Sequence, residues 1–194
     1  MKQELTGGEM SDQTLLSIIA LIVGGLGTMG AIITAVVALK NARNARRTIR
    51  FSVIDSLLSE YSSPEMNEAM KALGKWYDTH HKDEDWPQRF RELRVSGKPE
   101  DAMLDNSRRK FSHYEYRIHR FYQAKVIDLK MVKDIASVSN VSFLKYIIKP
   151  LEIAINPEHY DNELFKFFES LYSEEETRKD HESLHRSSNP AEGK

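Results

Sequence analysis

The chain has 194 residues and no cysteine, and its 28 Lys and Arg against 29 Asp and Glu give a formal net charge of −1. This near-neutral total gives no reason to expect a strongly charged partner. The absence of cysteine excludes a disulfide scaffold, thiolate catalysis and Cys-ligated zinc or iron–sulfur sites. All aromatic residues lie at or after Phe51, so an apolar N-terminal part precedes an aromatic-rich remainder.

The N-terminal part contains an uncharged segment over residues 13–39, in which residues 15–39 include 13 Leu, Ile or Val and 4 Gly. Twenty-five helical residues measure about 37 Å, which exceeds the ~30 Å hydrocarbon core of a bilayer. The 13 large aliphatic residues favour insertion by about 4 to 8 kcal/mol. A soluble helix would carry polar residues on one side, and a cleaved signal peptide would start with basic rather than acidic residues. We therefore predict a transmembrane helix over 13–39 after a short extracytoplasmic N-terminus, residues 1–12.

A basic cluster follows this segment directly and contains no acidic residue: Lys40, Arg43, Arg46, Arg47 and Arg50. The positive-inside rule places it in the cytoplasm, where each basic side chain gains roughly 1 kcal/mol from anionic headgroups. We expect a single-pass protein of the bacterial inner (plasma) membrane, with the N-terminus out and the C-terminal domain cytoplasmic. A nucleic-acid partner is not expected, because the cluster holds no aromatic residue and residues 51–194 carry a net charge of −4.

Small residues repeat at four-residue spacing within the span, at Gly27, Ala31 and Ala35. They could form a helix-packing ridge for self-association or for another membrane protein, or could merely dilute the hydrophobicity of the segment. The span holds no ionisable residue, so we expect no proton relay or ion path in the bilayer.

The basic cluster contains no Gly or Pro, and Phe51, Ile54, Leu58 and Tyr61 follow it at helical spacing. The pattern predicts that the transmembrane helix continues as a basic juxtamembrane helix over 40–62.

Ser63-Pro64 then signals a new helix, which opens a cytosolic α-helical domain over 63–172. A polar stretch around residues 78–85 contains the neighbouring histidines His80 and His81. Adjacent histidines diverge on regular structure, so we expect a solvated loop and no metal site there. A short helix is predicted from Trp86 to about Val95.

A long amphipathic helix is predicted from about Pro99 to Ala124. The side opposite its apolar stripe carries Arg109, His113, Arg117 and Arg120, which could form an anion-binding face or an ordinary solvated surface. His119 lies four residues after Glu115, which could hold the imidazole, although the pair alone specifies no reaction.

Three further helices complete the predicted domain. Asp128 is expected to cap the first and Asn140 the second, and Pro150 is expected to kink or restart the second. The last covers residues 158–172. Residues 173–194 are acidic and polar, so we expect a disordered tail. The fold class is thus all-α.

Residues 106–121 (NSRRKFSHYEYRIHRF), 125–128 (KVID) and 148–152 (IKPLE) resemble a broad group of uncharacterised bacterial proteins with one N-terminal span and a helical cytosolic domain. The resemblance implies this architecture and a bacterial inner membrane. It implies no catalytic residue.

The chain has no P-loop, no nucleophile elbow and no EF-hand loop. We therefore expect no catalytic residue, cofactor or metal. The leading hypothesis is a membrane-anchored interaction protein, an anchor, adaptor or sensor, that binds itself or another membrane or cytosolic protein. The alternative is a membrane-tethered effector or enzyme that recognises a nucleotide, RNA or another anion through the basic helix face.

Overall fold

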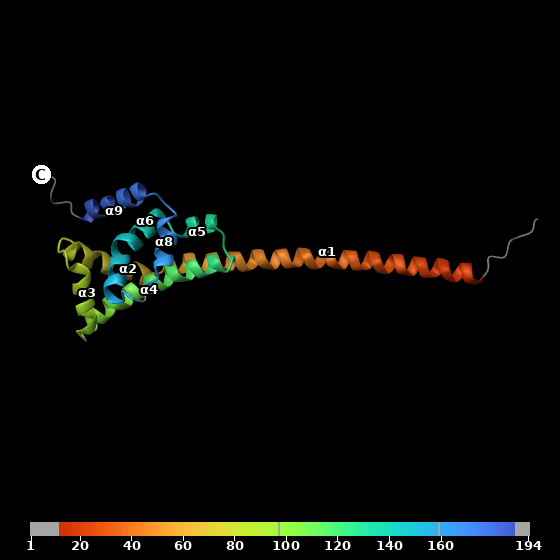
Figure 1. Ribbon diagram of the computed structural model, residues 1–194, viewed down its shortest axis with the longest axis horizontal. Coiled ribbons are helices and arrows are strands. Elements are labelled where there is room, and N and C mark those ends of the chain that lie inside the picture. Colours follow the sequence, from red (N-terminus) through yellow and green to blue (C-terminus); the bar gives the residue numbers. More distant parts are fainter. Residues whose placement is uncertain (1–11, 97, 159, 189–194) are drawn as a thin grey trace, which may run out of the picture. The chain divides into compact units, whose positions relative to one another are not determined.

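Figure 1 shows the computed structural model of the protein, which describes residues 12–96, 98–158 and 160–188. All regular structure in these residues is helical, so the all-α prediction is confirmed. The elements are α1 (Asp12–Tyr61), α2 (Pro64–His80), α3 (Trp86–Val95), α4 (Pro99–Gln123), α5 (Leu129–Ile135), α6 (Val138–Phe143), the π-helical turn η1 (Leu144–Ile148), α7 (Lys149–Ile155), α8 (Asn162–Glu169) and α9 (Glu174–Ser188). The chain divides into two compact units, Met1–Ile49 and Arg50–Lys194.

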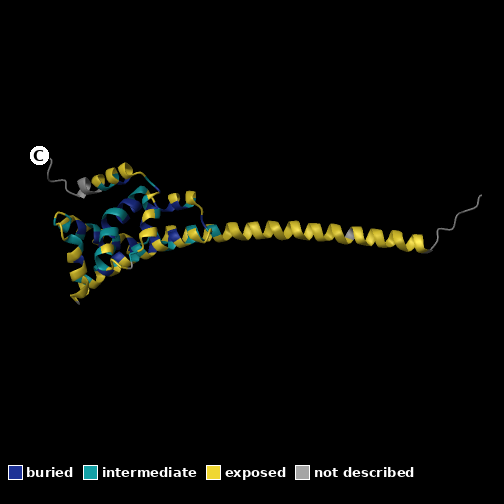
Figure 2. Ribbon diagram, viewed as in Figure 1, coloured by how far each residue is buried: buried dark blue, intermediate teal, exposed yellow. Residues whose placement is uncertain are grey.

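The first unit consists, where described, of the N-terminal part of α1. This helix is long and apolar enough to cross a membrane. Every side chain described between residues 13 and 49 is exposed, including the large aliphatic ones (Figure 2). The predicted extracytoplasmic N-terminus lies outside the described residues, except for Asp12.

The junction between α1 and α2 follows the local sequence signals. Ser63 caps α2 by accepting a hydrogen bond from the backbone N–H of Met66 at 3.1 Å, and Pro64 is the first helical residue. The helix before it ends at Tyr61, one residue before the end of the predicted juxtamembrane helix.

The C-terminal end of α1 packs one side against the core. Leu57 is fully buried, and Ile54 and Tyr61 pack against the core, whereas Phe51 and Leu58 are exposed. Two of the four apolar residues at helical spacing, Ile54 and Tyr61, therefore contact the core.

The core of the second unit forms where its helices pack in pairs: α2 on α4, α3 on α7 and α6 on α9. Figure 2 shows the buried segments gathered between these helices. Its largest fully buried side chains include Phe90, Phe111, Tyr114 and Phe168. The aromatic residues after Phe51 therefore supply much of the packing of this unit.

Two of the predicted cap and kink positions are confirmed and one is wrong. Asp128 accepts from the backbone N–H of Met131 at 3.0 Å and caps α5. Ser137, rather than Asn140, caps α6, and Asn140 is buried inside that helix. Before Pro150 the chain makes the π-helical turn η1, and α7 restarts with the proline in its first turn, as expected of a residue without a backbone N–H.

The C-terminal region departs from prediction in two places. The last predicted helix is shorter, because Asp161 caps α8 by accepting from the N–H of Leu164 at 3.1 Å. The predicted disordered tail instead forms α9 up to Ser188, and residues 189–194 lie outside the described part. Thr177 of α9 is buried, and its carbonyl accepts a hydrogen bond from the buried Ser142 hydroxyl at 3.0 Å. This hydrogen bond and the packing of α9 on α6 hold the helix against the rest of the unit.

Candidate functional site

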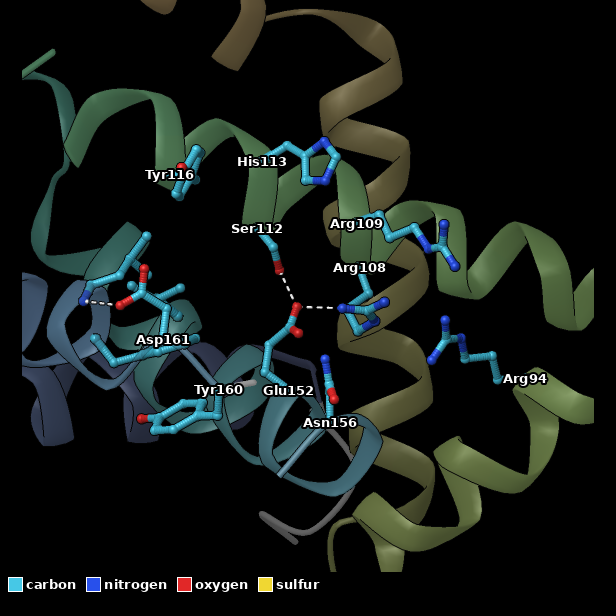
Figure 3. Close-up of a pocket in the computed structure, with 13 residues that line it drawn as sticks. Arg94, Arg108, Arg109, Ser112, His113, Tyr116, Glu152, Asn156, Tyr160 and Asp161 are labelled. Carbon is cyan, nitrogen blue, oxygen red and sulfur yellow. Dashed lines mark hydrogen bonds and ion pairs between the residues drawn. The ribbon is translucent and has the colours of Figure 1, made fainter. Parts of the chain in front are cut away.

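A cavity of about 460 Å³ lies within the second unit and has the size of a small-molecule site. Side chains of α3, α4, η1, α7, α8 and the segment leading into α8 surround it (Figure 3). The lining residues are Arg94, Arg108, Arg109, Ser112, His113, Tyr116, Leu144, Glu152, Asn156, Tyr160, Asp161, Leu164 and Phe165.

Three arginines at one end of this cavity share the buried carboxylate of Asp105. Arg108 donates to Asp105 Oδ1 through Nε and Nη2, at 2.9 and 2.8 Å. On the other oxygen, Oδ2, Arg109 Nε lies at 2.9 Å and Arg94 Nε at 3.3 Å. Burial alone would raise the pKa of Asp105, but the Arg108 hydrogen bonds and the three positive charges hold it below its usual value. The carboxylate thus stays ionised and orients all three guanidinium groups.

Glu152 of α7 neutralises one of these arginines. Its Oε1 atom pairs with Arg108 Nη1 and accepts from the Ser112 hydroxyl at 2.5 Å. Arg108 is thereby paired on both sides and nearly buried, so it ties α4 to α7.

The opposite end of the cavity is aromatic and apolar. Tyr160 stacks on Phe165 with ring centroids 5.0 Å apart, and the ring of Tyr116 is partly exposed beneath Arg120. Asp161 lies at the same end, where one of its oxygens caps α8. Figure 3 shows Arg94 and Arg109 on one side of the cavity and Tyr116, Tyr160 and Asp161 on the other.

The structure divides the predicted anion-binding face. Arg109 and His113 line the cavity. Arg117 pairs with Glu60 of α1, and Arg120 lies over the Tyr116 ring with its Cζ atom 5.4 Å from the centroid. The face is therefore not a single continuous basic surface.

Sequence reasoning missed Arg94, Arg108 and Glu152 as members of one site. Arg108 and Glu152 lie 44 positions apart, and Arg94 comes from a different helix. The pairing of the buried Asp105 and the partly buried Glu152 with these arginines became recognisable only once the helices were placed.

The other predicted residues lie in the first unit or at its end. The basic cluster Lys40, Arg43, Arg46, Arg47 and Arg50 occupies consecutive turns of α1 and is exposed or, at Arg50, partly exposed. In the ridge of Gly27, Ala31 and Ala35 all three residues are exposed, and a Cβ added at Gly27 meets no atom within 4 Å.

Glu115 does not hold His119. Both carboxylate oxygens of Glu115 are buried without a hydrogen-bond partner among the described residues, and burial raises the pKa of this group to about 8. His119 instead packs on Phe167 with ring centroids 4.8 Å apart, and burial lowers its pKa. The pair therefore forms no catalytic dyad.

Gly25, Gly27 and Gly30 match the spacing G-x-G-x-x-G of dinucleotide-binding loops. That motif requires a turn between a strand and a helix. These glycines lie in the middle of α1, so they form no phosphate-binding loop.

His181-Glu182-x-x-His185 in α9 matches the H-E-x-x-H signature of zinc peptidases, which sequence reasoning also missed. His181 Nε2 lies 3.1 Å from the Tyr77 hydroxyl, and Glu182 pairs with Arg178 at 2.6 Å. The described residues contain no group of three or more potential metal ligands. The signature therefore does not by itself assign a metal centre.

Comparisons of the chain with protein-family models, curated proteins and solved structures return no match.

Proposed function

We propose that the protein is a single-pass protein of the bacterial inner membrane, with its N-terminus outside and the helical unit from residue 50 onward in the cytoplasm. There it serves as an anchor, adaptor or sensor that binds itself or another membrane or cytosolic protein. The main observation in support of this proposal is that every side chain described in the uncharged segment 13–39 of α1 is exposed.

This exposure supports a membrane, rather than water, as the surroundings of the apolar part of α1. Twelve Leu, Ile and Val side chains described between residues 15 and 39 are exposed. Burying each in an apolar phase contributes roughly 1.5 to 3 kcal/mol, so their exposure to water would cost on the order of 20 kcal/mol or more. A bilayer removes that cost and lets the helix satisfy its backbone hydrogen bonds internally.

The orientation rests on charge. The five basic residues of the cluster follow the apolar segment within eleven positions, whereas Lys2 is the single basic residue before it. Such an asymmetry keeps the C-terminal side in the cytoplasm.

The experiment combines carbonate extraction of membranes with C-terminal fusions to alkaline phosphatase and to green fluorescent protein. We expect carbonate-resistant protein, a fluorescent fusion and an inactive phosphatase fusion. Replacing the five basic residues with Gln should mix or invert the topology, whereas the same change at five basic residues of α4 and α5 should not. Extraction of the wild-type chain by carbonate would refute the anchor.

Association through α1 is tested at the small-residue ridge. Gly27→Leu and Ala31→Leu should each reduce dimer formation in a bilayer association assay, since close approach of helix backbones needs small side chains. Ile33→Leu, on another side of the helix, is the matched control and should leave association unchanged. Equal association of all three variants with the wild type would assign the interaction to the cytoplasmic unit instead.

A further inference from the structure

The cavity described above is polar and cationic at one end and aromatic at the other. We infer that it binds a phosphate monoester that also carries an aromatic ring, of the size of a nucleoside monophosphate, with the phosphate between Arg94 and Arg109.

The two arginines keep hydrogen-bond donors for such a ligand. Each uses its Nε atom on Asp105 Oδ2, and no other polar or ring contact joins either arginine to the described residues. Their side chains are 41% and 50% exposed, so their outer N–H groups are accessible from the cavity. Asp105 thus orients both guanidinium groups through one edge and leaves the other edges available.

The charge at this end of the cavity also favours an anion. Three guanidinium groups face two carboxylates, those of Asp105 and Glu152, which leaves one positive charge uncompensated. Because Arg108 forms ion pairs with both carboxylates, the uncompensated positive charge lies on the half-exposed Arg94 and Arg109. His113 lines the cavity beside Arg109 and adds a ring N–H that can donate to an anion (Figure 3).

The geometry favours a phosphate over a carboxylate. Arg94 and Arg109 approach from different helices, α3 and α4, and each presents a planar fork of donors. A carboxylate offers two oxygens and one negative charge, whereas a phosphate monoester offers three terminal oxygens and up to two negative charges, so it can accept from more of the free donors of both arginines. The carboxylate of Glu152 does not oppose it strongly, because Arg108 and Ser112 already donate to its Oε1 atom.

The aromatic end of the cavity indicates which chemical group accompanies the phosphate in the ligand. The Tyr116 ring is 43% exposed, and Leu164 and Phe165 supply apolar wall. One Asp161 oxygen caps α8, and the other can accept a hydrogen bond from an amino or hydroxyl group. A flat ring with polar substituents therefore fits this end, and the negative charge of Asp161 keeps the phosphate at the arginine end.

The test is calorimetric titration of the full-length protein in detergent micelles with adenosine 5′-monophosphate, inorganic phosphate and adenosine. We expect the nucleotide to bind most tightly, inorganic phosphate more weakly and adenosine not measurably. Arg94→Gln and Arg109→Gln should each weaken nucleotide binding roughly tenfold to a hundredfold. Arg91→Gln, an exposed change on the same helix outside the cavity, is the matched control and should have no effect.

A second variant separates the two ends of the ligand. Tyr116→Ala should weaken nucleotide binding about tenfold, as loss of ring stacking does, and leave the affinity for inorganic phosphate unchanged. Circular dichroism of each variant confirms that the helical fold is retained.

Three results would overturn the inference: no binding of nucleotide or phosphate at millimolar concentration, equal binding by the Arg94→Gln/Arg109→Gln double variant, or tighter binding of benzoate than of the nucleotide. None of these depends on membrane anchoring, so this inference and the proposed function fail separately.

Discussion

Glu115 makes the stability of the helical unit depend on pH in a way that can be measured. Its side chain is completely buried in α4, and neither carboxylate oxygen has a hydrogen-bond partner among the described residues. Burial raises the pKa from the ordinary value of 4.5 to about 8, so the folded protein binds a proton that the unfolded chain releases at neutral pH.

The direction follows from linkage. Because the folded pKa is the higher one, the stabilisation is complete below pH 4.5 and is lost as the pH rises through 8. From these two pKa values, the wild type should lose about 2 to 3 kcal/mol of unfolding free energy between pH 5 and pH 7 through this one group. Glu115→Gln removes the titration and should abolish that part of the slope.

The assay is urea unfolding of the full-length protein in micelles at several pH values. Both tryptophans, Trp76 and Trp86, pack on the core of the helical unit, so their fluorescence reports its unfolding. The control is Glu68→Gln, an exposed carboxylate on α2 that should leave the slope unchanged. If Glu115→Gln unfolds with the same pH dependence as the wild type, the carboxylate is not a buried neutral acid and the reasoning is refuted.

Other predictions concern packing, capping and the buried ion pairs. Leu57→Ala should cost about 2 to 5 kcal/mol in the same unfolding assay, whereas Leu58→Ala, 44% exposed, should cost less than about 1 kcal/mol; equal costs would contradict the observed face of α1. Asp128→Ala should lose about 1 kcal/mol with the α5 cap, and Asp128→Asn should restore most of it. Arg108→Met should cost about 3 to 5 kcal/mol at pH 7, because Glu152 loses its arginine and the buried Asp105 keeps only Arg94 and Arg109. The cost should decrease as the pH falls below 3.8, the ordinary pKa of the Asp105 carboxyl, and a neutral effect at pH 7 would show that the pairs do not stabilise the fold.

Several helix boundaries could be predicted from local signals in the sequence. The side chains of Ser63 and Asp128 accept hydrogen bonds from backbone N–H groups three residues later, so their capping of α2 and α5 does not depend on distant parts of the chain. Pro150 is equally local, because its missing N–H disturbs only its own helix.

Features that depend on tertiary packing could not be predicted in the same way. The buried position of Leu57 depends on which helices cover α1, and the docking of α9 depends on Ser142 of a different helix. The cavity is the clearest case. Arg109 and His113 were recognised from their spacing on one helix, whereas Arg94 and Glu152 join them only through the packing of α3 and α7 against α4.

The most direct test of the proposed membrane topology uses the absence of native cysteine. Single-cysteine variants Thr6→Cys, before the apolar segment, and Lys166→Cys, an exposed position in α8, are treated with a membrane-impermeant maleimide in intact bacterial cells and after lysis. The proposal predicts labelling of the Thr6→Cys variant in intact cells and of the Lys166→Cys variant only after lysis. Labelling of the Lys166→Cys variant in intact cells, or of neither variant before lysis, would contradict it.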